Sequence, residues 1–194
     1  MTHPPLILAS TSPYRRELLE RLRVPFTCEK PGVDEDIAKR QLSDALAIVT
    51  TLARQKAQAV AERHPHAIVI GSDQAATIDG AILDKPGTAA NAIAQLQRLQ
   101  GRSHQLLTAV AIVQPRGLVE FVDTTTLTMR PLTTPAIERY VAAEQPLDCA
   151  GSYKIESLGI ALFERIESAD QTAIQGLPLL ALCRALRELD LPLP

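Results

Sequence analysis

Apolar residues along this chain of 194 residues follow two spacings, and each spacing predicts one kind of element. Continuous apolar runs at 6–9 and 67–70 are typical of buried strands, and we expect a further strand at 26–30. Apolar residues three or four positions apart predict helices. One helix follows Ser12, a suitable cap, and Pro13, which suits the first helical position. The longest helix begins near Ser43 and ends before Pro65.

Polar residues between these runs place the remaining elements. Residues 34–36 predict an acidic turn, and Asp79-Gly80 predicts a hairpin turn. Residues 104–113 and 118–129 are expected to pair as long antiparallel strands, with a last strand at 159–166. Further helices are expected to begin at Thr88, Pro135 and Pro178. This order predicts an α/β or α+β fold with a mixed sheet, and the absence of a linker or repeat predicts a single domain over 1–194.

Composition narrows the functions that such a domain can have. Hydrophobic residues make up 46% of the chain and the net charge is −2, which favours a folded protein over a disordered one. Because non-specific affinity for nucleic acids needs an excess of Lys and Arg, we expect no nucleic-acid polymer as a partner. The three cysteines lack metal-ligand spacing, which argues against zinc. No apolar stretch approaches the ~20 residues that span a bilayer, so we expect no membrane contact and a cytoplasmic protein.

Phosphate-binding chemistry is indicated where the first strand meets its helix. Ser10 and Ser12 bring hydroxyl groups to the positive end of the helix, and Arg15 and Arg16 follow within one turn. Several donors and local positive charge are what phosphate oxygens need. The same residues also fit a well-capped helix with two exposed arginines, so both interpretations stay open on this segment alone.

Charged residues elsewhere supply the rest of a candidate site. Asp73 directly follows the 67–70 strand, and the carboxyl end of a buried strand is a common place for a base or a metal ligand. Lys56 and Lys85, together with Arg15, could neutralise the charge of a polyphosphate. Glu35 and Asp73 could then hold the Mg²⁺ that it carries, because magnesium favours one or two carboxylates plus phosphates. Taken singly, Asp73 also fits a turn, and both lysines fit exposed positions.

Several segments of this chain have the order and spacing of a known family. They are LILASTSPYRRELLERL from residue 6, VDE at 33–35, ARQKA at 53–57, VIGSDQ at 69–74, LDKP at 83–86, CAGSYKIES at 149–157, GIALFERIE at 159–167 and GLPL at 176–179. Together they cover nearly the whole chain and resemble the Maf-type (septum-formation-inhibitor-like) nucleotide pyrophosphatases. The likeness is greatest to the subgroup that acts on 7-methyl-GTP.

This resemblance implies a fold, an assembly and a reaction. The expected structure is an elongated α/β fold of the Maf/inosine-triphosphatase-like kind, with two lobes around a cleft, assembled as a homodimer. The expected enzyme depends on a divalent cation, Mg²⁺ or Mn²⁺, and cuts between the α- and β-phosphates of a nucleoside triphosphate. From 7-methyl-GTP it would release 7-methyl-GMP and pyrophosphate, thereby removing a modified nucleotide.

The resemblance also implies roles for single residues. Asp73 matches the catalytic carboxylate that activates water, and we expect it to share the metal with Glu35. The expected substrate-binding residues are Ser10, Ser12, Arg15, Arg16, Glu35, Lys56 and Lys85. Tyr14, Gln74 and Glu156 match positions associated with substrate choice. An aromatic ring attracts the positive charge of 7-methylguanine, and a carboxylate suits the N–H edge of guanine.

Three other functions stay open. A pyrophosphatase of the family's other branch would act on dTTP or UTP with the same kind of site. A non-catalytic protein would bind nucleotide and regulate cell division, a role with which the family is also linked. A phosphatase with Asp73 as a phosphorylated nucleophile has less support, because Ala75 stands where its usual companion aspartate would be.

Overall fold

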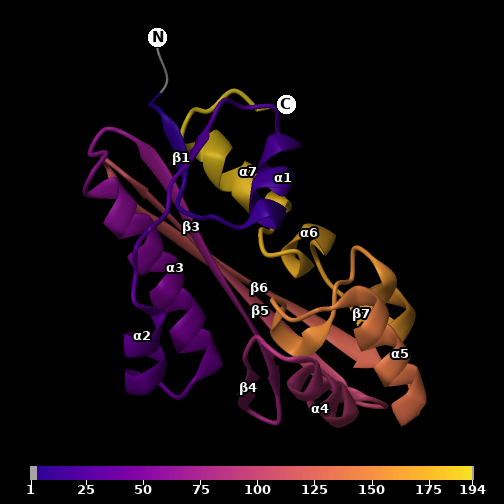
Figure 1. Cartoon of the computed structure of the whole chain (residues 1–194). Helices are drawn as coiled ribbons and strands as arrows, with labels where there is room; N and C mark the ends of the chain where they lie inside the picture. The colour runs from indigo at the N-terminus through magenta and orange to yellow at the C-terminus, as the bar shows by residue number, and fades with distance from the viewer. Residues whose placement is uncertain (1–3, 194) are drawn as a thin grey trace. The chain divides into compact units, whose positions relative to one another are not determined.

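The computed structural model describes residues 4–193 and contains a seven-stranded sheet (Figure 1). The strands are β1 (Leu6–Leu8), β2 (Thr27–Cys28), β3 (Ile68–Ile78), β4 (Ala81–Leu83), β5 (Ser103–Gln114), β6 (Gly117–Met129) and β7 (Phe163–Glu167). Their order is β2-β1-β3-β5-β6-β7, and β4 pairs with β3. Because β1 is parallel to β2 and β3, whereas β4 and β7 pair antiparallel with β3 and β6, the predicted mixed sheet is confirmed.

Helices accompany these strands and confirm the α/β class. The helices are α1 (Pro13–Glu20), α2 (Glu35–Gln41), α3 (Ala45–Ala61), α4 (Ala89–Leu99), α5 (Thr134–Glu144), α6 (Gln171–Ile174) and α7 (Leu179–Glu188), with 3₁₀ turns η1 (Ala150–Ser152) and η2 (Leu158–Leu162). Ser12 and Thr88 cap α1 and α4 as predicted, and the helix expected to begin near Ser43 is α3, which is capped by Asp44. Among the described residues, no helix has the length and apolar character needed to cross a membrane.

The chain divides into two compact units. Unit 1 consists of the described residues up to Asp73, together with Thr108–Asp123 and the residues from Asp170 onward. Unit 2 consists of Gln74–Leu107 and Thr124–Ala169. The single domain over 1–194 and the cleft between two lobes stay predictions.

The core of unit 1 holds the junction of β1 and α1 in place. Leu8, Ile70 and Ile112 come from three neighbouring strands, and all three are fully buried. Leu18 of α1 and Leu182 of α7 belong to the same apolar cluster. Each fully buried leucine of this kind is worth roughly 1.5–3 kcal/mol. The end of β1 and the first turn of α1 are therefore fixed by packing rather than by local preference alone.

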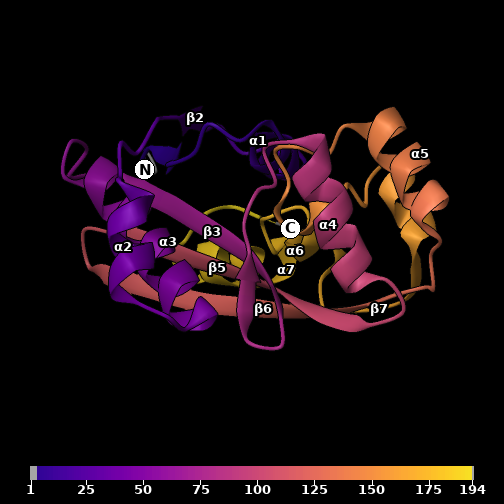
Figure 2. The same cartoon turned by 60° about the horizontal axis from the view of Figure 1, so that its bottom comes forward.

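In unit 2, α4 packs against α5 (Figure 2), and a histidine is buried among aromatic rings. His104 is only 3% exposed, and its Nε2 lies 2.9 Å from the hydroxyl of Tyr153. Tyr153 meets the ring of Phe163 edge-on, with centroids 4.9 Å apart. Within the described part of the chain, Nδ1 of His104 has no hydrogen-bond partner. Burial lowers the pKa of His104 to about 4.

The acidic turn predicted at 34–36 is wrong, because these residues begin helix α2. Asp34 caps this helix by accepting a hydrogen bond from the backbone N–H of Asp36 at 3.0 Å. Glu35 and Asp36 lie in the first turn, and Lys39 and Arg40 lie in the last. Negative charge near the N-terminus and positive charge near the C-terminus both favour a helix. The charges that suggested a turn therefore stabilise a helix instead.

The expectation that a strand ends before Asp73 is also wrong. β3 continues from Ile68 to Ile78, so Asp73 lies inside the strand. The parallel neighbour β1, however, ends at Leu8, which pairs with Ile70. Because its neighbour stops there, Asp73 still lies just beyond the carboxyl end of a parallel pair. This is the position at which the sequence predicts a base or a metal ligand.

The strand predicted at 159–166 begins later than expected. The first part of that segment forms η2, and β7 starts only at Phe163. Ile160, near the start of the predicted strand, is 54% exposed. The apolar run was therefore interpreted wrongly at its start, while the strand at its end is confirmed.

Protonation of His104 should destabilise the fold in acid. The unfolded chain binds this proton near the ordinary histidine pKa of ~6.5, whereas the folded protein binds it only near pH 4. Stability from the neutral ring is therefore present above pH ~6.5 and is lost as the pH falls toward 4. This group alone should lower the free energy of unfolding by about 2 kcal/mol between about pH 7 and pH 5.

Urea unfolding across this pH range measures the effect. His104→Phe should lose this part of the pH dependence, because phenylalanine binds no proton. The exposed His66 offers a matched control, and His66→Gln should keep the slope of the natural protein. An equal slope in His104→Phe and the natural protein would contradict the prediction.

Candidate active site

The junction of β1 and α1 presents two hydroxyl groups at a helix N-terminus. Ser10 is 6% exposed, and its Oγ accepts a hydrogen bond from the backbone N–H of Ser12 at 3.1 Å. The Oγ of Ser12 accepts in turn from the backbone N–H of Arg15 at 3.5 Å. Pro13 begins the helix, where its missing N–H costs nothing. The junction therefore combines two hydroxyl groups with the positive end of a helix dipole, which favours an anion.

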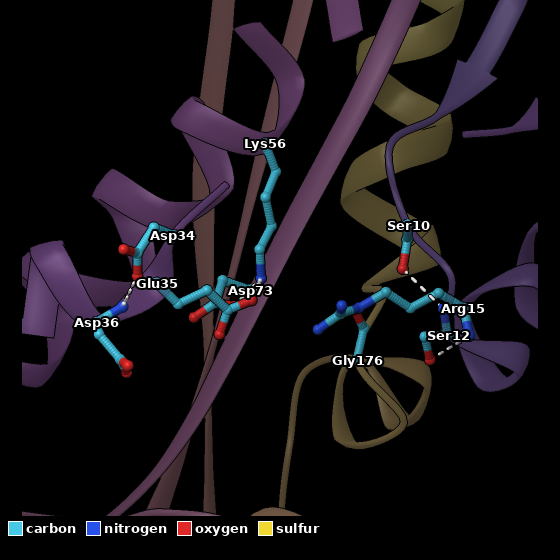
Figure 3. Close-up of polar contacts among 9 residues, drawn as sticks. All are labelled: Ser10, Ser12, Arg15, Asp34, Glu35, Asp36, Lys56, Asp73 and Gly176. Atoms are coloured by element: carbon cyan, nitrogen blue, oxygen red, sulfur yellow. Dashed lines mark hydrogen bonds and ion pairs between the residues drawn. The ribbon is translucent and has the colours of Figure 1, made fainter. Parts of the chain in front are cut away.

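Arg15 of α1 turns toward the loop between α6 and α7. Its Nε donates a hydrogen bond to the backbone carbonyl of Gly176 at 2.9 Å (Figure 3). Burial lowers the pKa of this guanidinium, and the carboxylates of Asp73 and Glu35 act in the opposite direction. An arginine stays protonated in proteins. Arg15 is therefore a fixed positive charge in the electrostatic field of both carboxylates.

Lys56 of α3 joins the two carboxylates. Its Nζ lies 2.6 Å from Oδ1 of Asp73 and 2.7 Å from Oε1 of Glu35. Figure 3 shows the lysine side chain reaching from α3 toward Asp73 and Glu35. Lys56 and Asp73 are buried, whereas Glu35 is exposed. The charged cluster therefore extends from the interior of unit 1 to its surface.

A glycine allows α3 to lie close enough to β3 for this contact. A Cβ atom at Gly71 would clash with the carbonyl oxygen of Ala53 and would lie 2.7 Å from the backbone nitrogen of Ala57. Both partners belong to the turns of α3 that carry Lys56. Since successive side chains of a strand alternate between its faces, Gly71 and Asp73 point to the same side. The close backbone approach at Gly71 thus brings Lys56 within reach of Asp73.

Burial and neighbouring charges shift the pKa of the Asp73 carboxyl in opposite directions. Burial raises its pKa, and the positive charges of Lys56 and Arg15 act to lower it. The net shift is upward, with a further upward contribution from the charge of Glu35. A buried carboxylate with a raised pKa and a specific cationic partner is typical of a general base.

Two carboxylates are available for a divalent cation. Among the described residues, no three His, Cys, Asp or Glu side chains gather into a metal-binding group. Asp73 and Glu35 nevertheless approach the same Lys56 nitrogen, so their oxygens lie close together. Magnesium suits such a pair, because it keeps waters and takes further ligands from substrate phosphates. The donor set therefore fits Mg²⁺ or Mn²⁺ bound together with a polyphosphate.

Two further predicted residues belong to α1. Arg16 pairs with Glu20 at 2.9 Å on an exposed part of the helix, where the two side chains are 65% and 50% exposed. Exposed pairs of this spacing contribute only about 0.3–0.5 kcal/mol. Tyr14 is half-buried in the first turn of α1. The fit of Arg16 to an exposed surface position is the alternative that the sequence had left open.

The remaining predicted residues belong to unit 2. Gln74 follows Asp73 along β3 and is half-buried, and Lys85 is exposed between β4 and α4. Glu156 is exposed in the segment between η1 and η2. That segment is anchored to α5, because the carboxylate of Glu144 accepts hydrogen bonds from the Ser157 hydroxyl at 2.6 Å and the backbone N–H of Leu158 at 3.0 Å.

Sequence reasoning missed two residues of the site. The hydroxyl of Ser72 donates to the Gly176 carbonyl at 2.9 Å, so this oxygen accepts from both Ser72 and Arg15. Both residues stand inside segments that carried the family resemblance, GSDQ and GLPL. Nothing in either segment indicates that they meet, since 104 residues separate them in the chain.

A sequence profile of the family described as Maf-like protein matches residues 5–189. The chain belongs to the Maf family. It is 52% identical over 192 residues to a 7-methyl-GTP pyrophosphatase of Xanthomonas campestris pv. campestris, covering 98% of this chain and 99% of that protein. It is 50% identical over 192 residues to a 7-methyl-GTP pyrophosphatase of Ralstonia nicotianae, covering 98% of each. The resemblance to Maf-type proteins is thereby confirmed.

A solved structure shares the fold of this Maf-family chain. The Ham1 protein of Staphylococcus aureus aligns with a TM-score of 0.54 at 15% identity, covering 95% of this chain and 98% of that one. This likeness confirms the predicted α/β fold class.

Replacing Gly71 by alanine should separate α3 from β3. The added Cβ meets backbone atoms of α3 that no side-chain rotation can move, and overpacking of this kind costs about 3 kcal/mol. Gly32→Ala is the control, because Gly32 has a positive φ of 72° but no neighbour within 4 Å of the added atom, so only about 1 kcal/mol of backbone strain is expected. Urea unfolding measures both, and equal losses would contradict the packing role of Gly71.

Proposed function

We propose that this protein hydrolyses 7-methyl-GTP to 7-methyl-GMP and pyrophosphate, and so removes a modified nucleotide. The observation that carries the proposal is a buried aspartate, Asp73, held by Lys56 in the same unit as an arginine at a helix N-terminus. Relatives that are 52% and 50% identical to this chain, and that match it over nearly their whole length, are named 7-methyl-GTP pyrophosphatase. A carboxylate base beside an anion-binding loop is what the hydrolysis of a phosphoanhydride needs.

The phosphates are bound at the β1–α1 junction in this proposal. Ser10 and Ser12 supply hydroxyl groups, the N-terminus of α1 supplies the positive end of a helix dipole, and Arg15 supplies a fixed positive charge. Gly176 accepts from Nε of Arg15, so the terminal N–H groups of the guanidinium are the donors that can meet phosphate oxygens. Such fixed donors stabilise charge that develops on the oxygens during reaction.

Asp73 acts as the base. Its carboxylate takes a proton from the water that attacks phosphorus, while the bond to the pyrophosphate leaving group breaks. Lys56 favours the ionised carboxylate by charge and by hydrogen bonding. The raised pKa that burial gives to Asp73 makes it a stronger base than an exposed carboxylate.

Asp73 and Glu35 would hold a divalent cation, Mg²⁺ or Mn²⁺, together with the substrate. Such a cation supplies positive charge to phosphate oxygens when bound. Lys56 contacts both carboxylates and so keeps them near one another. Lys85 and Arg16 are further candidates for contact with phosphates, each as an exposed cation.

Substrate choice is assigned to Tyr14, Gln74 and Glu156. A ring attracts a delocalised cation such as 7-methylguanine by about 0.5–2 kcal/mol. A carboxylate that accepts from the N–H edge of guanine would face acceptors on a pyrimidine, which discriminates against dTTP and UTP. We further propose that the protein works in the cytoplasm as a homodimer.

Product analysis tests the proposed reaction. The protein mixed with 7-methyl-GTP and Mg²⁺ or Mn²⁺ should release 7-methyl-GMP and pyrophosphate in equal amounts, and a chelator should stop the reaction. Parallel assays with GTP, dTTP and UTP test the branch of the family. Release of inorganic phosphate alone would contradict the proposal. Intact nucleotide that stays bound without turnover would favour the regulatory alternative.

Asp73→Asn should separate binding from chemistry. The amide keeps the shape of the side chain but cannot take a proton, so most of the rate should be lost, by about 10²-fold or more. The affinity for nucleotide should persist, because Arg15 and the α1 N-terminus are unchanged. Calorimetry of nucleotide binding beside the rate assay checks both parts, and a variant that turns over at the natural rate would remove Asp73 as the base.

Lys56→Gln should shift the pH profile of activity. The charge of Lys56 lowers the pKa of Asp73, so its removal should raise that pKa further. Because the base works only when ionised, the acid limb of the profile should move to higher pH. Lys30→Gln replaces an exposed lysine and should leave the limb in place. A limb that moves to lower pH, or equally in both variants, would contradict the assigned role of Lys56.

A further inference from the structure

One backbone carbonyl in unit 1 receives hydrogen bonds from two separate elements. The oxygen of Gly176 accepts from Nε of Arg15 on α1 and from Oγ of Ser72 on β3, both at 2.9 Å. A carbonyl oxygen has two lone pairs, so these two donors satisfy it. The phosphate-binding arginine and the strand of the catalytic carboxylate thus meet at a single atom.

The conformation of Gly176 makes this meeting possible. Its φ of +101° lies in a region that side chains other than glycine rarely adopt. A Cβ atom at this position would lie 3.1 Å from Nε of Arg15, which is tighter than ordinary contact. The glycine therefore both turns its carbonyl toward the two donors and leaves room for the guanidinium.

Ser72 lies on β3 directly before Asp73. It is fully buried, and its neighbour Asp73 bonds to Lys56. Side chains alternate across a strand, so Ser72 faces away from α3, toward the loop that carries Gly176.

The bond to Nε fixes how Arg15 presents its other donors. A guanidinium is planar, and its five N–H groups stand in a rigid fork. Once Nε is held by Gly176, the directions of the four terminal N–H groups follow. An arginine that binds phosphate needs this direction, because bidentate contact depends on geometry as well as charge.

We propose that Ser72 is a positioning residue, which orients Arg15 toward phosphate by holding the Gly176 carbonyl. This inference rests on the proposed function, since it takes Arg15 as a ligand of the substrate phosphates. In this proposal Ser72 acts through Gly176 and Arg15 and does not itself bind the substrate. The simpler role of a buried hydroxyl that only satisfies its own hydrogen bond predicts a loss of stability without any link to Arg15.

A double-mutant cycle between Ser72 and Arg15 separates these roles. Ser72→Ala should lower kcat/KM by about 3- to 10-fold, as expected for one lost hydrogen bond. In the Arg15→Ala background the same change should have no further effect, because the group that Ser72 orients is gone. Equal losses in both backgrounds would overturn the proposal. Ser72→Cys, which keeps a side chain of similar size with a weaker donor, serves as the second variant where Ser72→Ala folds poorly.

Thr108→Val is the matched control. The hydroxyl of Thr108 donates to the carbonyl of Ala173 at 2.9 Å, so it ties a buried strand to the neighbouring segment three residues before Gly176. The factor by which Thr108→Val lowers kcat/KM should be the same with Arg15 present and in the Arg15→Ala background. The factor for Ser72→Ala should disappear in that background. Coupling of the same size in both pairs would show a general packing effect and would overturn the specific role of Ser72.

A readout independent of turnover keeps the inference separate from the proposed function. Binding of inorganic tripolyphosphate, measured by calorimetry, needs Arg15 but no catalysis. The cycle should show the same coupling in the dissociation constant, and independent effects there would overturn the proposal. A protein that fails to hydrolyse 7-methyl-GTP but shows this coupling would contradict the function and leave the positioning role of Ser72 intact.

Discussion

The ammonium group of Lys56 holds the two carboxylates of the candidate active site together. Its two contacts at 2.6 and 2.7 Å tie a buried aspartate to an exposed glutamate. Removing one partner of a buried ion pair is costly, because the charge left behind has lost both its water and its partner. Lys56 and Asp73 therefore depend on each other. Their contact in turn requires α3 to approach β3 as closely as Gly71 allows.

Three consecutive residues of β3 perform three different tasks. Gly71 lets the helix approach, Ser72 reaches the loop of Gly176, and Asp73 carries the carboxylate. Alternation along the strand sends the first and third to one face and the second to the other. This short segment thus links the carboxylate that Lys56 contacts to the carbonyl that accepts from Arg15, within unit 1.

Local features of this fold were predictable from sequence, and distant contacts were not. The cap of α1 depends on Ser12 and its neighbours, so the sequence predicts it. The apolar run ends at Ile70, so the strand was expected to end before Asp73. Its continuation to Ile78 depends on neighbouring strands, which no local pattern specifies. The candidate residues Asp73, Lys56 and Arg15 came from pattern and resemblance. Their partner Gly176 lies more than a hundred residues along the chain from Ser72 and follows only from the fold.

The charges of the site explain why a cation belongs to the proposed reaction. Arg15 and Lys56 balance Asp73 and Glu35, so the group is neutral in sum and can be partly buried. A nucleoside triphosphate brings several negative charges to the same place, while the charges of Arg15 and Lys56 are already balanced by Asp73 and Glu35. Repulsion from Asp73 and Glu35 would then oppose binding, unless positive charge arrives with the substrate. A divalent cation held by these carboxylates and the phosphates would convert that repulsion into attraction.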